Sequence, residues 1–359
     1  MKETVTAGFQ TVTPMLMFGA DQSRAEIRIP SIKGALRFWY RAVDPHYWKH
    51  EPQLFGSGGE KGGQSRFLMR LKTISQPEKY EKKWRKGVGY SYLSFSIKKN
   101  REPISVGTSF EISFYRRGHL DDHGNEEDWK RLMASVWLLG HMGGLGSRSR
   151  RGFGSLTLKS IDPKSSVSEP FSLPLIHRQK KPHEWMHAFQ SGMDQIQGWL
   201  GKRSTEPKHT VLDGKSTFHL HMHGYHDWKL AMDELGKTLK DFREKEGDRE
   251  ISGRKKWSKG AAVGLPLIIK QEEEQKTFSP KKGDRNASPI WMRIVKIGKK
   301  YYPFVTVLST DTSIDQVVCR NEKGEEQPDQ TLSVEIAETL DAFRHHLQNQ
   351  GYRWEAGGD

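Results

Sequence analysis

The sequence predicts an α+β fold, and two observations support this prediction. Short segments rich in β-branched and aromatic residues alternate with longer segments whose apolar residues recur at helical spacing. The order strand–helix–strand–strand–helix–strand, with an extra hairpin, occurs in the first half of the chain and returns in degenerate form in the second half. We therefore expect tandem ferredoxin-like (RRM-like) domains.

The first domain is expected to cover residues 1–161. Its predicted strands are 4–17, 65–74, 91–97, 109–116 and 153–161, and its predicted helices are 31–43 and 127–142. Ser31 is the expected N-cap of the first helix. Leu36, Trp39 and Val43 form the apolar face of that helix, so Trp39 is expected in the core.

The second domain is expected to cover residues 213–359, after a linker at 162–212 that carries an inserted helix at 184–200. Its predicted strands are 217–223, 261–270, 289–297 and 300–308, and its predicted helices are 227–245 and 332–347. These segments follow the order of the first domain only in part, with little obvious sequence identity between the two halves.

The charge of the 359-residue chain is positive and unevenly distributed. The formal net charge is +14, and residues 1–160 hold 27 basic and 15 acidic side chains. Residues 253–300 form a second basic zone, whereas residues 301–359 hold 4 basic and 11 acidic side chains. Such segregation indicates a polyanion on one face and a basic protein neighbour near the acidic end, although a solvated charged face is the simpler alternative.

Composition also excludes several classes of protein. The one cysteine, Cys319, cannot form an internal disulfide or a multi-cysteine zinc site, which fits a reducing cytoplasm. The longest apolar run, residues 261–269, is far shorter than the about 20 residues of a membrane span. The first residues lack the pattern of a secretory signal. We expect a cytoplasmic protein that does not enter a membrane.

A Gly-rich segment at 143–154 is the most informative motif. Its glycines would let the backbone approach a phosphate, and its serines and arginines would add hydrogen-bond donors. It has neither the Gly-Lys-Ser/Thr of a Walker A loop nor the strand-to-helix position of a dinucleotide fingerprint, so nucleotide hydrolysis has little support. A flexible turn with solvated arginines is the alternative. The predicted RNA contacts in this loop are Gly144, Gly146, Ser147, Arg148, Ser149, Arg150 and Arg151.

The helix predicted from residue 31 is the second candidate for phosphate binding. Lys33, Arg37 and Arg41 recur every four residues and form a basic stripe, and Arg28 lies just before the helix. Tyr40 flanks this stripe and could either pack in the core or stack on a base.

Several histidines are candidates for metal ligands or for acid/base groups. Three of them alternate along a predicted strand and could bind zinc or nickel, but an amphipathic strand with an apolar opposite face is the better explanation. These are His219, His221 and His223, opposite Phe218, Leu220 and Met222. Asp21, His46 and His141 lie near the basic segments, but no spacing fixes an acid/base pair. We predict no metal, no cofactor and no catalytic residue.

Together these motifs resemble the RAMP superfamily of CRISPR effector proteins, and in particular the first subunits of type III-B Cmr complexes. The matching stretches are residues 29–42, 54–57, 143–154, 264–267 and 285–289, which adds Arg285 to the predicted RNA contacts. In one departure, Val263 stands where an aromatic residue is expected before Gly264.

The resemblance implies tandem ferredoxin-like domains and an RNA-binding subunit at the end of a ribonucleoprotein complex for antiviral defence. Its implied partners are the guide RNA (crRNA), whose 3′ part it would hold, target single-stranded RNA and other RAMP subunits. Target cleavage would belong to another subunit, so we predict a protein that is not an enzyme. Two alternatives stay open: a metal-independent endoribonuclease that processes guide RNA through a histidine, and a scaffold that contacts only neighbouring subunits.

Overall fold

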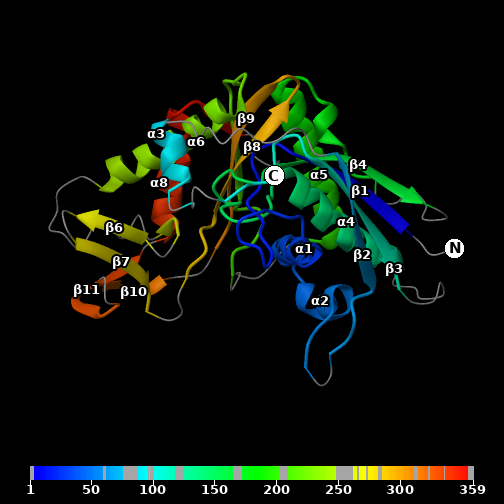
Figure 1. The fold of residues 1–359 in the computed structure, drawn as a ribbon, viewed down its shortest axis with the longest axis horizontal. Coiled ribbons are helices and arrows are strands. Elements are labelled where there is room, and N and C mark those ends of the chain that lie inside the picture. The colour runs from blue at the N-terminus through cyan, green and yellow to red at the C-terminus, as the bar shows by residue number, and fades with distance from the viewer. Residues whose placement is uncertain are drawn as a thin grey trace.

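The structure is a computed structural model of the 359-residue chain, shown in Figure 1. It describes residues 4–59, 62–75, 87–95, 97, 101–117, 125–164, 172–202, 209–247, 262–264, 267–271, 274–281, 285–310, 314–321, 324–334 and 336–354. Helices combine with antiparallel sheets, which confirms the α+β prediction. No helix within these ranges is long and apolar enough to cross a membrane.

The first sheet is built by the first half of the chain. It contains β1 (Thr4–Thr11), β2 (Phe67–Ser75), β3 (Ser109–Arg116) and β4 (Leu156–Lys164), in the order β2-β3-β1-β4. The helices α1 (Ile29–Val43) and α4 (Asn125–His141) pack on each other, and their apolar residues share one core with those of the sheet. This core explains the spacing seen in the sequence, since Leu36, Trp39 and Trp137 are all buried in it.

A second sheet has the same strand order as the first. It contains β5 (Thr217–His221), β8 (Ile290–Ile297), β9 (Lys300–Val307) and β12 (Tyr352–Trp354), in the order β12-β5-β9-β8. Counted along the chain within each half, both sheets therefore run 2-3-1-4. The helices α6 (Trp228–Gly247) and α8 (Ile336–Asn349) contribute apolar residues to the second core.

A third sheet is assembled from two insertions in the second half. It contains β6 (Leu267–Gln271), β7 (Glu274–Pro280), β10 (Ile314–Arg320) and β11 (Glu326–Val334), in the order β11-β10-β7-β6. The first hairpin lies between α6 and β8, and the second lies between β9 and α8. In Figure 1 this sheet stands at the opposite end of the molecule from β1–β4.

The segment predicted as a linker contains α5 (Pro182–Leu200), preceded by a 3₁₀ turn at Ile176–Arg178. The helix is more than a connection because its aromatic residues join both halves. Phe189 stacks on Trp137 of α4 at a centroid distance of 5.6 Å, and Trp185 meets Phe304 of β9 at 5.2 Å. The halves therefore share a packed aromatic seam.

One predicted strand is wrong. The residues predicted as a strand at 91–97 begin in a helix, α3 (Val88–Leu93), which packs on α6. The two helices meet at Gly89 and Gly236, where an added Cβ on either residue would clash with the backbone of the other helix. Tyr90 and Leu93 are buried by this packing, so tertiary contact overrides their preference for strands.

Several boundaries also differ from the prediction. The first helix begins at Ile29 with Arg28 as its N-cap, so Ser31 lies inside it, because Pro30 suits the first turn of a helix. The first strand ends at Thr11 instead of reaching residue 17. Of the strand predicted at 261–270, residues from Leu267 onward are strand and residues 262–264 are not, while residues 261, 265 and 266 lie outside the described residues. Helix α2 (Tyr47–Phe55) and the strands β7, β10, β11 and β12 were not predicted.

Candidate nucleic-acid interface

Helix α1 separates an apolar face from a basic one. Trp39, Tyr40 and Val43 are buried, so Tyr40 packs in the core and cannot stack on a base. On the other face Lys33 is half-buried and Arg41 is exposed. The basic stripe therefore lies at the surface, as the spacing of the sequence predicts.

A basic cavity of about 560 Å³ opens beside the first turns of α1. Its described lining contains three cations, Lys33, Arg37 and Arg117, and no carboxylate. Apolar side chains and the glycine-rich turn after α2 complete it: Ile29, Phe55, Gly56, Ser57, Gly58, Gly63, Gln64, Ser65, Phe67, Leu68 and Met69. This volume lies in the usual range of small-molecule sites, about 300–1,000 Å³.

The electrostatics of this cavity favour an anion. Burial lowers the pKa of the Lys33 ammonium, and the charges of Arg37 and Arg117 lower it further. Among the described residues, no carboxylate forms an ion pair with Lys33. A bound phosphate would relieve this repulsion. The prediction from sequence omitted Arg117, because only the fold brings the end of β3 to α1.

Arg37 and Arg41 are tied to one carboxylate. The Arg37 Nε lies 2.9 Å from Glu51 Oε1, and Arg41 donates from Nε and Nη2 to the two Glu51 oxygens at 2.7 and 2.5 Å. Arg37 also donates to the Gly56 carbonyl. Two guanidinium groups and one carboxylate leave one net positive charge, so this pair attracts a polyanion less than two free arginines would.

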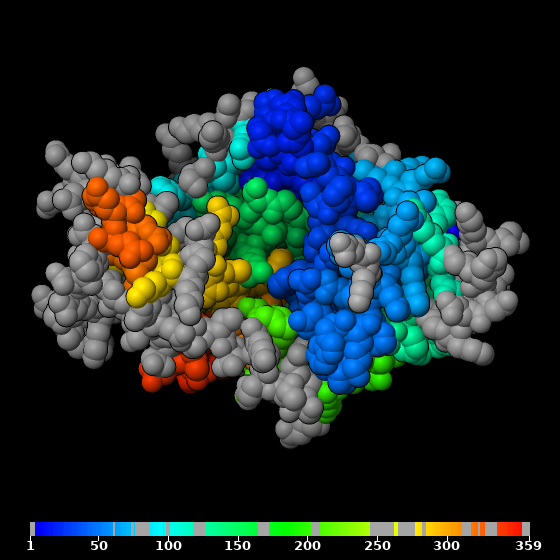
Figure 2. All heavy atoms as spheres, turned by 90° about the horizontal axis from the view of Figure 1, so that it is seen from below, coloured from blue at the N-terminus to red at the C-terminus, as the bar shows by residue number. Residues whose placement is uncertain are grey.

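The Gly-rich segment lies between the two halves of the molecule. The backbone N–H of Ser147 donates to Leu16 O at 2.8 Å, and that of Gly152 donates to Met292 O at 2.9 Å. On the face shown in Figure 2, the segment forms the green patch between blue N-terminal residues and yellow residues of the second half. The loop is thus part of the seam that joins the two halves.

The glycines of this loop allow its backbone to pack closely against other parts of the protein. Gly146 has a φ of +86°, and a Cβ there would lie 2.6 Å from Leu16 O. Gly154 has a φ of +63°, and a Cβ there would clash with Leu145 O. Gly144 is buried. The predicted close approach of the backbone is present, but the groups approached are protein carbonyls.

The three loop arginines donate to protein carbonyls as well. Arg148 donates to Leu93 O at 3.2 Å and to Phe95 O. Arg151 donates to Val263 O at 3.0 Å, and burial lowers its pKa to about 9. These contacts connect the loop to α3 and to the second half, which is a structural role that the sequence did not predict.

Arg150 joins the loop to α1 and β8. Its guanidinium carbon lies 5.0 Å from the Phe38 ring centroid and 4.8 Å from that of Trp291, and it donates to the Ser288 carbonyl. Cation–π contacts of a desolvated guanidinium are worth about 2 kcal/mol. RNA binding by the side chains of Arg148, Arg150 and Arg151 stays a prediction, and their contacts inside the protein compete with it.

The remaining predicted RNA contacts are Arg28, Ser147, Ser149 and Arg285. Arg28 forms an ion pair with Glu26 at 3.4 Å and donates to Phe18 O at 3.3 Å. Ser147 is exposed, and Ser149 is half-buried. Arg285 is exposed three residues before Ser288, where Arg150 binds. The part of the basic zone at 253–261 lies outside the described residues.

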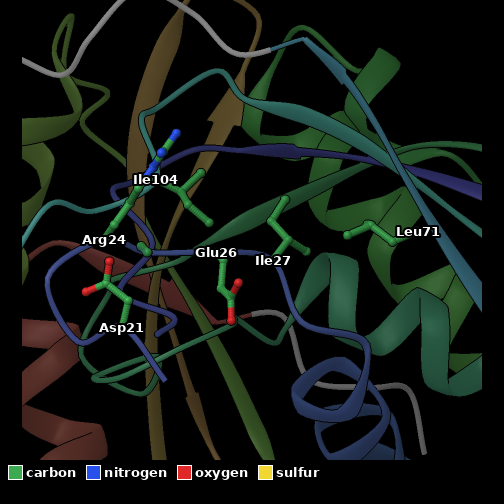
Figure 3. A pocket seen from close by; sticks show the side chains of 7 residues that line it. Asp21, Arg24, Glu26, Ile27, Leu71 and Ile104 are labelled. Atoms are coloured by element: carbon green, nitrogen blue, oxygen red, sulfur yellow. The ribbon is translucent and has the colours of Figure 1, made fainter. Parts of the chain in front are cut away.

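A second cavity, of about 390 Å³, has a different character (Figure 3). Arg24 shares it with the carboxylates of Asp21 and Glu26, beside Ala25, Ile27, Leu71 and Ile104. Hydrogen bonds from Ser23 lower the pKa of Asp21, which favours its charged form. Two carboxylates beside one arginine do not favour a phosphate.

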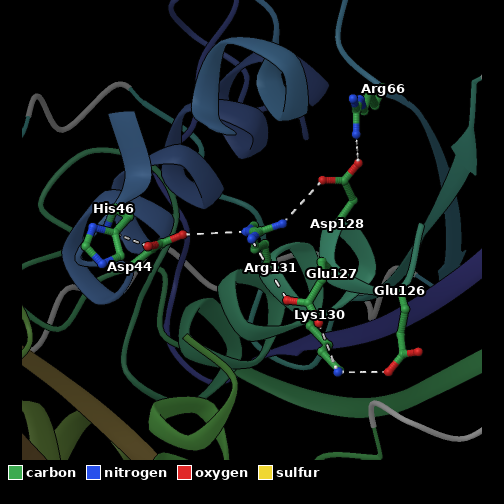
Figure 4. Close-up of polar contacts among 8 residues, drawn as sticks. All are labelled: Asp44, His46, Arg66, Glu126, Glu127, Asp128, Lys130 and Arg131. Atoms are coloured by element: carbon green, nitrogen blue, oxygen red, sulfur yellow. Dashed lines mark hydrogen bonds and ion pairs between the residues drawn. The ribbon is translucent and has the colours of Figure 1, made fainter. Parts of the chain in front are cut away.

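A network of charges holds the connection between α1 and α2 against α4 (Figure 4). The Arg131 side chain lies between Asp44 Oδ2, at 3.7 Å, and Asp128 Oδ1, at 3.6 Å. Asp128 also pairs with Arg66, and Asp44 Oδ1 accepts the backbone N–H of His46 at 2.7 Å. The start of α2 is therefore fixed relative to the first core.

The candidate histidines do not form a metal site. Among the described residues, no group of three His, Cys, Asp or Glu side chains could hold a metal ion. His219 is buried and contacts Thr217 Oγ1 at 3.0 Å, and burial lowers its pKa to about 4. His221 is also buried, whereas Met222, expected in the core, is 46% exposed. The predicted amphipathic pattern fails because residues 218–221 of the central strand β5 are all buried, on both faces, and because the strand ends at His221, before Met222.

The sequence of this chain is similar to those of the RAMP superfamily and of Cmr subunits. Residues 9–157 match the model of the RAMP superfamily. The CRISPR system Cmr subunit Cmr1-1 of Pyrococcus furiosus is 27% identical over 296 residues, which cover 77% of this chain and 78% of that protein. Cmr1-2 of the same organism is 29% identical over 185 residues, 42% of this chain and 93% of that protein.

Solved structures share the fold. Apo Cmr1 from Pyrococcus furiosus aligns with a TM-score of 0.62 and 21% identity over 99% of both chains. A chain of the type III-B Cmr-beta complex bound to cognate target RNA aligns with a TM-score of 0.59 and 11% identity over 97% of this chain and 100% of that one. The resemblance predicted from the sequence is confirmed.

Proposed function

We propose that this chain, a relative of the Cmr1 subunits with a RAMP superfamily region at residues 9–157, is a non-catalytic RNA-binding subunit of a type III-B CRISPR effector complex. It would hold the 3′ part of the guide RNA, the target RNA or both, through backbone phosphates. Its proposed partners are these RNAs and other RAMP subunits.

The basic cavity is the observation that carries this proposal. Three cations converge on a space of about 560 Å³ whose described lining lacks a carboxylate, and the pKa of Lys33 is lowered by burial and by the charges of Arg37 and Arg117. Phosphate contacts position a strand without reading its sequence, which suits a subunit that must accept many guides. Ser147 and Arg285 are exposed and could extend the same contact surface.

We also propose that both halves are ferredoxin-like domains. The support is the shared 2-3-1-4 strand order, together with the helices that pack into the two cores, α1 and α4 in the first half and α6 and α8 in the second. We retain the division into residues 1–161, 162–212 and 213–359, with α5 as a packed bridge between the domains. The third sheet would then be an addition to the second domain.

We propose that the chain does not itself cleave RNA. An endoribonuclease that acts without metal needs an acid/base side chain that reaches the RNA, most often a histidine. His141 and His219 are buried, and burial lowers the pKa of His141 to about 3, so neither fits this role. His46, the other histidine near the basic segments, is exposed and can be tested by substitution.

Binding of unrelated short single-stranded RNAs to the purified full chain, followed by fluorescence anisotropy at several salt concentrations, tests the function. We expect similar affinity for all sequences and a steep loss of affinity with salt. Incubation of the same RNAs with the protein in EDTA should leave them intact. Discrete cleavage that is lost in a His46→Ala variant would refute the non-catalytic proposal.

A further inference from the structure

Helix α2 presents an aromatic side chain to solvent beside the basic stripe of α1. Trp48 is 54% exposed, whereas Leu54 and Phe55 of the same helix are buried. An exposed indole next to cations is the combination that proteins use to bind unpaired bases.

The aromatic neighbours of Trp48 contact its ring at steep angles and do not stack on it. His46 and Tyr47 lie at centroid distances of 5.6 and 5.7 Å, at interplanar angles of 76° and 85°. Tyr47 is held in turn by His209, at 5.3 Å and 83°. Neither ring lies parallel to the Trp48 indole, and because the residue is 54% exposed, part of its surface is open to a planar group.

Trp48 also lies next to the end of the basic stripe. Glu51, three residues further along α2, accepts both hydrogen bonds from Arg41. Residues three apart on a helix are neighbours, with Cβ atoms about 5–6 Å apart. The Arg41 side chain is 48% exposed, and Lys49, which follows Trp48 in the sequence, is also exposed. Exposed positive charge is therefore present on both α1 and α2 near this position.

The distance to the basic cavity suits one continuous strand of RNA. Lys33 and Arg41 are two four-residue steps apart on α1, which corresponds to about 12 Å along the helix axis. With phosphates at least about 3.4 Å apart along a strand, this span corresponds to at most about three nucleotides. A phosphate in the cavity would leave a base a few nucleotides away within reach of α2.

We propose that Trp48 is a stacking platform for an unpaired base of the RNA that the Lys33 cavity holds by its phosphate. The inference rests on the proposed RNA-binding function. It assigns α2 a role distinct from that of α1, because stacking depends on the presence of a base and carries no charge. RNA is favoured over a protein partner as the occupant, since the indole continues a basic surface.

The test compares RNA binding by full-length Trp48→Ala, Trp48→Phe and wild-type chains. We expect the alanine variant to bind single-stranded RNA about fivefold or more weakly, the lower bound for loss of one base–aromatic stack. The phenylalanine variant should remain within about twofold of wild type, because it keeps a π-face. The salt dependence should be unchanged in both, since no charge is removed.

Two controls make the result specific. Met222→Ala, at another exposed apolar side chain far along the sequence, should bind RNA like wild type. An abasic oligomer with an intact sugar–phosphate backbone should bind wild type and Trp48→Ala equally. Circular dichroism and a thermal melt establish that each variant is folded.

Each contrary outcome identifies what fails. Wild-type affinity of folded Trp48→Ala, together with weaker binding by Lys33→Ala, would overturn the stacking inference and leave the proposed function standing. Normal RNA binding but lost co-purification with partner subunits would show that Trp48 docks a protein. Absence of RNA binding by the wild-type chain would refute the proposed function, and the inference with it.

Discussion

Lys33 offers the most direct test of the phosphate site, because the structure gives its ammonium no anionic partner among the described residues. It lines the basic cavity with Arg37 and Arg117, and burial and these two charges lower its pKa. A Lys33→Ala variant should keep α1 intact, since alanine has the highest helix propensity. It should, however, lose one phosphate contact.

The expected size of the effect follows from counterion release. One phosphate contact on a single strand contributes about 0.7 to the slope of log K against log salt. Between 50 and 200 mM salt, wild type should therefore lose about 2.6-fold more affinity than Lys33→Ala. The measurement is anisotropy of a labelled single-stranded RNA across that range.

The matched control is Lys299→Ala, which removes an exposed lysine at the turn between β8 and β9. This variant carries the same change of net charge but leaves the cavity intact. Equal slopes for wild type, Lys33→Ala and Lys299→Ala would refute the assignment of the cavity. Equal reductions in both variants would show that only overall charge matters.

Three further predictions concern the same face. Because burial lowers the pKa of Lys33 below 10.5, RNA affinity should fall as the pH rises towards the ordinary lysine value, and Lys33→Arg should abolish that fall in a pH series of binding curves. Replacing Arg37 and Arg41 together by alanine should lower the salt slope by about 0.7 and not 1.4, because both arginines share Glu51. Gly154→Ala should destabilise the fold by about 1–3 kcal/mol in a thermal or urea melt, because its φ is positive and a Cβ would clash with a carbonyl.

Controls for these predictions use the same chain. Gly214→Ala adds a Cβ where no atom lies within 4 Å, so its melt should match that of wild type within about 0.5 kcal/mol. A slope reduced by 1.4 in the double arginine variant would mean that Glu51 does not offset their charge when RNA binds. A pH dependence that survives in Lys33→Arg would have to arise from another group.

The α1 helix shows what sequence could predict well. Leu36, Trp39 and Val43 recur at helical spacing, and all three are buried, so local periodicity was sufficient to place one face. The strand order of the second half was harder to predict. Its fourth strand, β12, has only three residues, too few for an alternating pattern to be visible.

The Gly-rich segment shows a physical limit of prediction from sequence. Glycines at 146 and 154 indicate that a backbone must approach something closely, and it does. Composition cannot distinguish a phosphate from a protein carbonyl, because both are acceptors for the same N–H and guanidinium donors. Likewise, Arg117 joins the cavity only through the pairing of β3 in the sheet, a contact that no local pattern encodes.

The central claim is that RNA lies along α1 and α2, and crosslinking tests it most directly. The measurement is photocrosslinking of RNA in the assembled complex, followed by identification of the crosslinked peptides. We predict crosslinks within residues 29–69, which span α1, α2 and the start of β2, and around Arg117. Crosslinks confined to the second half of the chain, for example to the sheet formed by β6, β7, β10 and β11, would contradict the account.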